Sequence, residues 1–186
     1  MRRIAITSSA SGNGKTTLGR EVARRLDAPF VELDAIHHGP GWTELSAEEL
    51  RAQVAPIVAT DAWVIDGGYR AKLGDLVLER ADLVVWLDLP LRVWLPRLLR
   101  RTVRRIVRRE ELWNGNRETW RGAFGGPDSL VGWAVRAHFS RRQRYPTVLA
   151  PYPVVRLRTQ RAVEDWLASI DEFRPGGGSE GKRRQR

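Results

Sequence analysis

The sequence predicts an α/β fold, in which helices cover both faces of a parallel sheet, and three observations lead to this prediction. Short strand-like runs recur along the chain at 3–7, 30–33, 62–65, 83–87 and 154–157. The runs at 62–65 and 83–87 are apolar throughout, which is typical of strands buried on both faces. Helical segments separate most of the runs, and a polar glycine-rich turn joins the first strand to the first helix. We therefore expect a single three-layer α/β/α domain.

The helical segments are recognised from their periodicity and their end signals. Residues 15–26 carry apolar side chains at helical spacing on one face. Ser46 followed by Glu49 forms a capping box, which predicts a helix beginning there. A helix is expected from about Leu91, although Pro96 lacks a backbone donor and predicts a kink or a delayed start. Two further helices are expected at 129–144 and 162–170.

Length and composition are those of an ordinary globular domain. The 186 residues suit one domain over 1–174, followed by a disordered basic tail at 175–186 that is rich in glycine. The absence of cysteine excludes disulfides and thiolate chemistry. No apolar run approaches the roughly 20 residues needed to span a bilayer. We expect a cytoplasmic protein without a membrane partner, acting as a monomer or homodimer.

The net charge of +10 is local rather than general. The tail from Arg174 carries five basic residues and Glu180, and residues 92–109 carry eight arginines and no acid. Without these two segments the chain is close to neutral. The basic segments leave a nucleic-acid partner open, although no aromatic-interleaved RNA motif is present.

A phosphate-binding loop follows the first strand. It matches the pattern G-x-x-x-x-G-K-[ST] at every fixed position except the first, where serine replaces glycine. Its residues are Ser9, Ala10, Ser11, Gly12, Asn13, Gly14, Lys15 and Thr16, with Thr17 next to them. Backbone N–H groups and the helix N-terminus converge on the phosphates in such a loop. We expect ATP here, with Lys15 on the β and γ oxygens, Thr16 on Mg²⁺ and Thr17 near the α-phosphate.

Beyond this P-loop, the sequence resembles nucleoside monophosphate kinases of the adenylate kinase type, and more closely the small P-loop kinases known as topology modulation proteins. Residues 66–70, Asp-Gly-Gly-Tyr-Arg, resemble the D-G-F-P-R element of adenylate kinases, and residues 87–90 resemble their D-x-P element. The resemblance implies a five-stranded sheet in the order 2-3-1-4-5 with a helical lid at about 97–136. It also implies that Arg97 and Arg101 grip the transferring phosphates and that Arg70 faces an anionic group of the acceptor.

Arginines and carboxylates in the same region fit phosphoryl transfer, which needs positive charge on the migrating group and an acid to support Mg²⁺. Arg97, Arg101, Arg104 and Arg108 share one helical face, which is otherwise a solvated basic face. Of the two strand-end acids, Asp66 is favoured for Mg²⁺, whereas Asp88 alternatively caps the following helix.

The lid is the least defined region of the sequence. Arg117, Arg121 and Arg136 loosely resemble the later arginines of a kinase lid. Trp113 and Trp120 cover a closed site or form a small core of the insertion.

The acceptor side is expected at the end of the second strand, where related kinases bind the phosphoryl acceptor. Asp34 is a candidate general base for an acceptor hydroxyl, the role found in hydroxyl-phosphorylating P-loop kinases; alternatively it caps the strand. Trp42 is either a stacking surface for the acceptor or a core residue. His37 and His38 suggest a metal pair, but adjacent side chains usually point apart and no third ligand is apparent. We therefore expect substrate-edge or surface histidines.

The sequence thus predicts an ATP-dependent phosphotransferase that acts on a small-molecule acceptor, most simply a hydroxyl. Lys15, Asp34, Arg97 and Arg101 are the expected catalytic residues, and Asp34, Asp66, Arg70 and Trp42 are expected to contact the acceptor. Three alternatives stay open: a nucleoside monophosphate kinase, in which Arg51 and Arg70 anchor the acceptor phosphate; a nucleic-acid-associated P-loop ATPase; and an ATP-binding structural protein without turnover.

Overall fold

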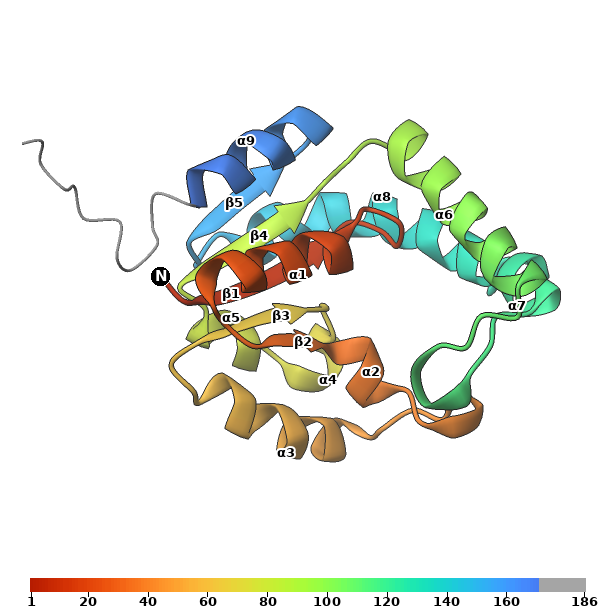
Figure 1. Cartoon of the computed structure of the whole chain (residues 1–186), viewed down its shortest axis with the longest axis horizontal. Helices are drawn as coiled ribbons and strands as arrows, with labels where there is room; N and C mark the ends of the chain where they lie inside the picture. Colours follow the sequence, from red (N-terminus) through yellow and green to blue (C-terminus); the bar gives the residue numbers. More distant parts are fainter. Residues whose placement is uncertain (171–186) are drawn as a thin grey trace, which may run out of the picture.

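A computed structural model describes residues 1–170 and contains one five-stranded parallel sheet (Figure 1). The strands are β1 (Arg3–Ser8), β2 (Phe30–Glu32), β3 (Trp63–Asp66), β4 (Leu83–Leu87) and β5 (Val154–Leu157). Their order across the sheet is β2-β3-β1-β4-β5, which confirms the predicted order. The predicted tail at 175–186 lies outside the described residues.

Nine α-helices within residues 1–170 connect and cover the strands. They are α1 (Lys15–Leu26), α2 (Leu33–His37), α3 (Ala47–Val58), α4 (Arg70–Leu73), α5 (Leu76–Arg80), α6 (Leu91–Val107), α7 (Trp120–Phe124), α8 (Leu130–Leu149) and α9 (Gln160–Ile170). Two single 3₁₀ turns, η1 (Pro40–Trp42) and η2 (Trp113–Gly115), lie in the longer loops. None of these helices is both long and apolar enough to cross a lipid bilayer.

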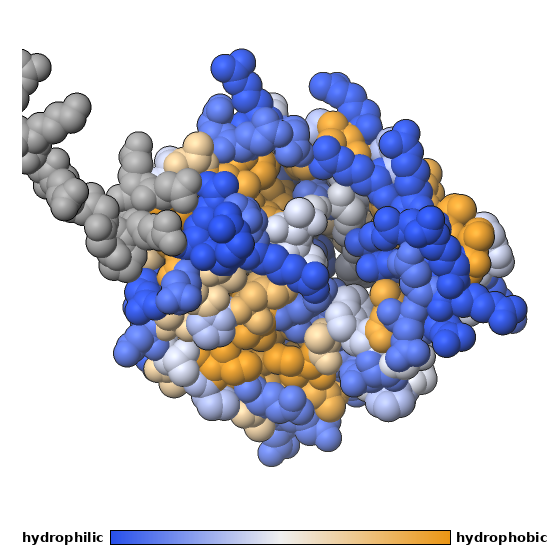
Figure 2. Space-filling model, viewed as in Figure 1, coloured by the Kyte–Doolittle hydropathy of each residue, from blue (hydrophilic) through white to orange (hydrophobic). Residues whose placement is uncertain are grey.

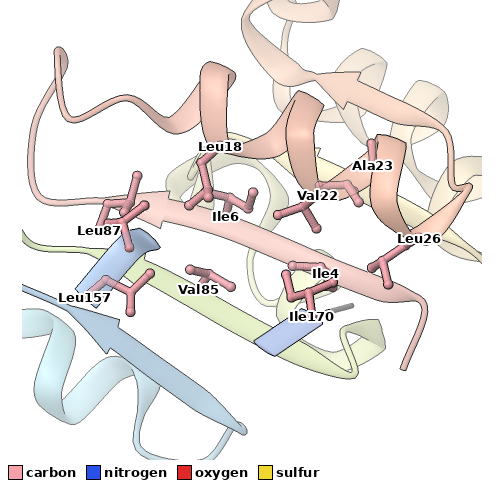
Figure 3. Close-up of a cluster of buried hydrophobic side chains, with 12 residues drawn as sticks. Ile4, Ile6, Leu18, Val22, Ala23, Leu26, Val85, Leu87, Leu157 and Ile170 are labelled. Atoms are coloured by element: carbon pink, nitrogen blue, oxygen red, sulfur yellow. The ribbon is translucent and has the colours of Figure 1, made fainter. Parts of the chain in front are cut away.

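Alternating side chains of the strands build a core on each face of the sheet. On one face, Ile4 and Ile6 of β1 pack with Val22 of α1 and with α9 (Figure 3). On the other face, Ala5 and Trp63 pack with α3, α5 and the end of α8. The sheet is therefore the middle of three layers, and the predicted α/β/α arrangement is confirmed.

Two local sequence signals can be compared with the structure: the capping box at the start of α3 and the proline inside α6. Ser46 accepts a hydrogen bond from the Glu49 amide and Glu49 accepts one from the Ser46 amide, so the predicted capping box is present. Helix α6 begins at Leu91 and continues through Pro96, so the expected delay does not occur. Pro96 and Arg92, whose carbonyl loses its usual donor, are both exposed, and water can satisfy that carbonyl.

An arm formed by α6, α7 and α8 stands beside the carboxyl edge of the sheet (Figure 1). Trp94 and Leu98 of α6 pack with Ala134 of α8 and with Ala10 of the P-loop. The arm is therefore anchored on the nucleotide side of the molecule. The arm includes the region expected as a lid, about 97–136, and extends beyond it at both ends. Trp120 in the arm is 55% exposed and forms no core.

Asp88 follows β4 and is buried in a network of charged groups. Its carboxylate accepts hydrogen bonds from Ser9 at 2.7 Å and from Arg156 at 2.6 Å, and it pairs with Arg142 at 3.1 Å. Pro90 occupies the N-cap position of helix α6 and no side chain caps that end, so the interpretation of Asp88 as a helix cap is wrong. Asp88 joins the P-loop, α8 and β5.

We predict that Asp88→Ala lowers the free energy of unfolding by about 2 kcal/mol, because it leaves two arginines without a partner next to a buried site. The value is below the roughly 3–5 kcal/mol found for breaking a fully buried pair, since both arginines are about one-third exposed and can reach water. Urea unfolding measures it. Asp128→Ala is the matched control: Asp128 pairs with Arg136 but is 98% exposed. Equal losses in the two variants would contradict the structural role of Asp88.

Candidate active site

The P-loop backbone depends on two glycines. Gly12 and Gly14 have φ angles of 84° and 88°, a region that residues with a side chain rarely adopt. A Cβ on Gly12 would also lie 2.9 Å from the Trp94 carbonyl oxygen. The loop can therefore keep this path against α6 only with glycine at position 12.

The serine that departs from the P-loop pattern has a structural role. Ser9 is fully buried, where its hydroxyl donates to Asp88 and accepts from the Trp86 indole at 3.0 Å. Its backbone does not need a positive φ, so glycine is not required there. Ser9 and Ala10 are both buried and do not line the cavity, whereas Ser11 to Thr17 do. Asn13 closes the loop by donating to the Ala10 carbonyl at 2.9 Å.

Lys15, Thr16 and Asp66 meet beneath the P-loop. The Thr16 hydroxyl donates to Asp66 Oδ2 at 2.6 Å, and Lys15 Nζ lies 3.6 Å from Asp66 Oδ1. That Oδ1 is buried without a hydrogen-bond partner among the described residues. A hydroxyl and a carboxylate with a spare oxygen form the hard oxygen donor set that Mg²⁺ prefers. Thr16 and Asp66 therefore fit the metal that the sequence assigns to them.

Glu32 belongs to the same group and was missed in the sequence. It ends β2 directly beside Asp66, and its carboxylate lies 3.3 Å from the Thr16 hydroxyl. Burial and the Asp66 carboxylate raise the pKa of Glu32, whereas a hydrogen bond from Trp113 acts in the opposite direction. The pairing of two parallel strands was the available signal, because it brings strand-end acids side by side.

Asp34 lies in the first turn of α2, immediately after β2, and lines the cavity. Tyr69 donates its hydroxyl proton to Asp34 Oδ1 at 2.6 Å, and the same hydroxyl lies 3.2 Å from His38 Nε2. Burial and the negative charge of Asp34 raise the pKa of Tyr69, so the phenol stays protonated. One oxygen of Asp34 is thus held in place by Tyr69.

The two histidines do not point apart as expected. Their ring centroids are 4.8 Å apart, and His37 is only 1% exposed. A third possible metal ligand, Glu44, has a carboxylate oxygen 3.2 Å from His37 Nε2. Lys72 already occupies this cluster, donating to Glu44 at 2.8 Å and lying 3.3 Å from His37 Nε2. Burial and Lys72 lower the pKa of His37, which favours the neutral ring.

Helix α6 directs arginines into the cavity. Arg97, Arg101 and Arg104 line it as their spacing predicts, but Arg108 does not, and Arg105 lines it instead. Arg101 is half-buried, and its Nε has no hydrogen-bond partner among the described residues. Burial and Arg105 lower its pKa, while Glu118, Asp34 and Glu32 oppose this shift. Arg97 also lines the cavity but is exposed and donates to Gln160 at 3.1 Å. Arg101 is therefore the arginine best placed to meet a buried anion.

Other arginines from the sequence lie away from the cavity centre. Arg70 pairs with Asp75 and does not line the cavity, so the structure does not bring it to the acceptor. Arg51 donates to the Lys72 carbonyl at 2.8 Å and likewise lies outside. Arg136 pairs with the exposed Asp128, and Arg117 lies at the rim, 3.8 Å from Glu111.

Arg141 of α8 is a second cavity residue that the sequence did not reveal. It donates to the Ser8 carbonyl at 3.3 Å, at the start of the P-loop, and its guanidinium lies over the Trp133 ring. Several arginines occur in this helix with no motif to separate them. Only the packing of α8 along the sheet selects Arg141.

Two loops from distant parts of the sequence join across the cavity. Asn116 donates to the Gly39 carbonyl at 2.9 Å and accepts from the Trp42 amide at 2.8 Å. The Trp42 indole donates to the Arg117 carbonyl at 3.3 Å, and Trp113 stacks with His38 at 6.1 Å. We call these segments, residues 38–44 and 111–117, the acceptor loop and the arm loop. Trp42 packs in their contact rather than in the core.

The P-loop, Asp34 and the arm surround one continuous cavity with a volume of about 1960 Å³. Figure 2 shows a hollow near the centre of this face, with strongly hydrophilic side chains on the arm beside it. Drug-sized ligands occupy pockets of roughly 300–1,000 Å³. The cavity is therefore large enough for a nucleotide and a second small molecule together.

Known proteins resemble the chain in sequence and in fold. No family model matches the chain. A shikimate kinase of Corynebacterium diphtheriae is 31% identical over 100 residues, which cover 47% of the chain and 58% of that relative. The match thus spans less than two-thirds of the relative's length.

Solved structures resemble nearly the whole chain. The shikimate kinase of Acinetobacter baumannii in complex with shikimate has a TM-score of 0.56 and 18% identity, covering 93% of each chain. A gluconokinase of Sinorhizobium meliloti has a TM-score of 0.51 and 19% identity, covering 92% of the chain and 94% of its own. At these identities the likeness establishes the fold. The chain therefore has the P-loop kinase fold found in shikimate kinase and gluconokinase.

Proposed function

We propose that the protein is an ATP-dependent phosphotransferase that moves the γ-phosphoryl group of ATP to a hydroxyl of a small molecule. The observation that carries the proposal is that the P-loop and Asp34 open onto the same cavity. The similarity to a shikimate kinase and the shared fold support it. We place this enzyme in the cytoplasm, as the sequence leads us to expect.

ATP binds with its phosphates on residues 11–17. Lys15 leaves Asp66 to neutralise the β and γ oxygens, and Thr17 contacts the α-phosphate. Thr16 and Asp66 would hold Mg²⁺, and Glu32 beside them would accept hydrogen bonds from water bound there. The metal supplies charge neutralisation at the phosphates. The Thr16 to Asp66 hydrogen bond supports this arrangement, because it preorganises the two ligands before ATP arrives.

Helix α6 supplies the positive charge that stabilises the migrating phosphoryl group. Arg101 contacts the γ-phosphoryl oxygens, and Arg97 assists from the rim of the cavity. The half-buried and incompletely hydrogen-bonded guanidinium of Arg101 supports this role, because a charge held away from water stabilises the developing negative charge more strongly.

Asp34 is the general base. The acceptor hydroxyl attacks the γ-phosphorus as its proton passes to Asp34, the bond between the γ-phosphorus and the β–γ bridging oxygen breaks, and ADP leaves. The hydrogen bond from Tyr69 fixes one carboxylate oxygen and leaves the other for the acceptor. Trp42 closes the wall on this side.

The contact between the acceptor loop and the arm loop excludes water from the reacting groups. Water is a competing acceptor for the γ-phosphoryl group, so a kinase must close its site before transfer. Asn116 is 3% exposed and bonds both sides of the contact, which supports a closed cavity in this state.

The alternatives fit the geometry less well. A monophosphate acceptor needs cations on the acceptor side, but Arg51 and Arg70 do not line the cavity. A nucleic-acid role would use the arginines of α6, of which Arg97, Arg101, Arg104 and Arg105 line the cavity instead. Within P-loop kinases, the motifs at 66–70 and 87–90 support grouping the chain with the topology modulation proteins.

We predict that Lys15→Ala lowers the rate of phosphoryl transfer by roughly 100-fold or more, because the phosphate charge loses its closest cation. ADP formation measures the loss, and circular dichroism checks that the fold is kept. Lys15 is in the loop and outside the core, so the fold should not change. Turnover equal to that of the native protein would refute the P-loop assignment.

We predict that Asp34→Asn lowers kcat by roughly 100-fold or more with little change in ATP affinity, because the amide keeps the shape of the side chain and removes its basicity. Steady-state kinetics with the true acceptor measures both values. Asp61→Asn, at an exposed acid before β3, is the control and should be neutral. An unchanged kcat in Asp34→Asn would exclude general-base catalysis by this residue.

We predict that Asn116→Ala raises ADP formation without acceptor by about 5-fold relative to phosphoryl transfer, because water enters when the two loops separate. The ratio of the two rates is measured on one preparation. Arg121→Ala, at an exposed position of α7 in the same arm, should leave the ratio unchanged. A ratio that stays constant in Asn116→Ala would show that the loop contact does not exclude water.

A further inference from the structure

The charged side chains on the acceptor side of the cavity indicate what net charge a bound acceptor can have. We define the acceptor half as the cavity residues within 32–44, 67–72 and 111–118, together with Arg101 and Arg105 of α6 that face them. A bound molecule with a carboxylate or phosphate needs an available cation here, because burying an unpaired charge is costly.

Most cations of the acceptor half already have a carboxylate partner within the chain. Lys72 pairs with Glu44 at 2.8 Å, and Arg105 pairs with Glu118 at 3.0 Å. Arg117 lies 3.8 Å from Glu111 at the rim. These groups compensate one another, so they attract an anion only weakly.

The ammonium of Lys72 is also saturated with hydrogen bonds. Besides Glu44, it donates to the Leu45 carbonyl at 2.8 Å and lies 3.3 Å from His37 Nε2. An ammonium has three protons to donate. Recruiting Lys72 for a substrate carboxylate would therefore break contacts that already exist.

Two other cations that line the cavity, Arg141 and Arg101, are expected to meet the phosphates. Arg141 is fixed on the Ser8 carbonyl at the start of the P-loop. Arg101 has no ion-pair partner among residues 1–170, but Asp34, Glu32 and Glu118 surround it electrostatically. In the proposed reaction, Arg101 contacts the γ-phosphoryl group during transfer, so its charge is not available to the acceptor.

Hydrogen-bond acceptors, in contrast, are in excess. Glu118 Oε2 is buried without a hydrogen-bond partner among the described residues, and its side chain is 9% exposed. Asp34 lines the cavity, and Tyr69 donates to only one of its two carboxylate oxygens. Both carboxylates can accept hydrogen bonds from the hydroxyl groups of a ligand.

We propose that the acceptor is an uncharged polyhydroxylated molecule, and that Glu44, by holding Lys72, excludes acidic acceptors. The inference rests on the proposed function. Each hydroxyl supplies a donor to a carboxylate of the acceptor half, whereas a carboxylate in the same position meets further carboxylates. Arg101 is the one cation of the acceptor half without an ion-pair partner among residues 1–170, and the proposed function assigns it to the γ-phosphoryl group. A site discriminates strongly against a substrate that leaves its buried polar groups without hydrogen-bond partners.

The experiment uses three six-carbon acceptors that differ only at C1. Sorbitol carries a hydroxymethyl group, gluconate a carboxylate and glucamine an ammonium. Glycerol, inositol and shikimate extend the panel to other carbon frameworks. ADP formation and kcat/KM are measured with the full chain. We expect kcat/KM for sorbitol to exceed that for gluconate by about 10-fold or more.

A matched variant tests the mechanism of exclusion. Glu44→Gln keeps the shape of an exposed side chain and leaves Lys72 uncompensated. The sorbitol-to-gluconate ratio should fall about 5-fold, through a lower KM for gluconate. Adding Lys72→Met should reverse that gain, whereas Glu48→Gln, at an exposed acid four residues away, should leave the ratio unchanged.

The outcomes separate the inference from the proposed function. Greater use of gluconate or shikimate than of the neutral acceptors would overturn the inference, and so would greater use of glucamine. Lys15-dependent ATP turnover with no transfer to any neutral polyol would also overturn it while leaving the P-loop enzyme intact. No ADP formation under any condition would reject the proposed function itself.

Discussion

The parallel pairing of β2, β3 and β1 is the constraint on which the candidate site depends. Its register sets Glu32 beside Asp66 and Asp66 beside Ile6, so the carboxyl ends of three strands meet at one edge. The P-loop continues from β1 at that edge, which brings Thr16 to Asp66. Open parallel sheets place ligands outside the carboxyl ends of their strands, because the loops and helix N-termini converge there.

The arm depends on this edge through packing rather than through charge. Trp94 and Leu98 hold α6 against Ala10, and Gly12 passes so close to the Trp94 carbonyl that a side chain would not fit. The position of Arg101 is therefore tied to the shape of the P-loop. Asp88 adds a polar link on the same side, joining Ser9 to Arg142 and Arg156.

The acceptor side is organised differently, by internal neutralisation and by a contact between loops. Lys72 contacts His37 and Glu44, two of the three groups that could otherwise ligate a metal ion together with His38. Asn116 links the acceptor loop to the arm loop through main-chain groups that side-chain chemistry alone does not reveal. The same half of the cavity is thus closed by a contact between two loops, and its Lys72 is already paired with a carboxylate of the chain.

The sequence by itself determined the sheet, the P-loop and most of the elements, because these follow from local signals: continuous apolar runs, helical periodicity, caps and a fixed motif spacing. It also singled out Asp34 and Asp66, since acids at strand ends meet at one edge. Only the tertiary structure decided which groups those acids meet. Strand pairing adds Glu32 to the site, and helix packing adds Arg141. Arg70 pairs with Asp75 outside the cavity, and Ser9 is bonded to Asp88 in the interior. Asp75 is only five residues from Arg70, but the other partners lie far away in the chain, as Asp88 does from Ser9, and no local pattern records those contacts.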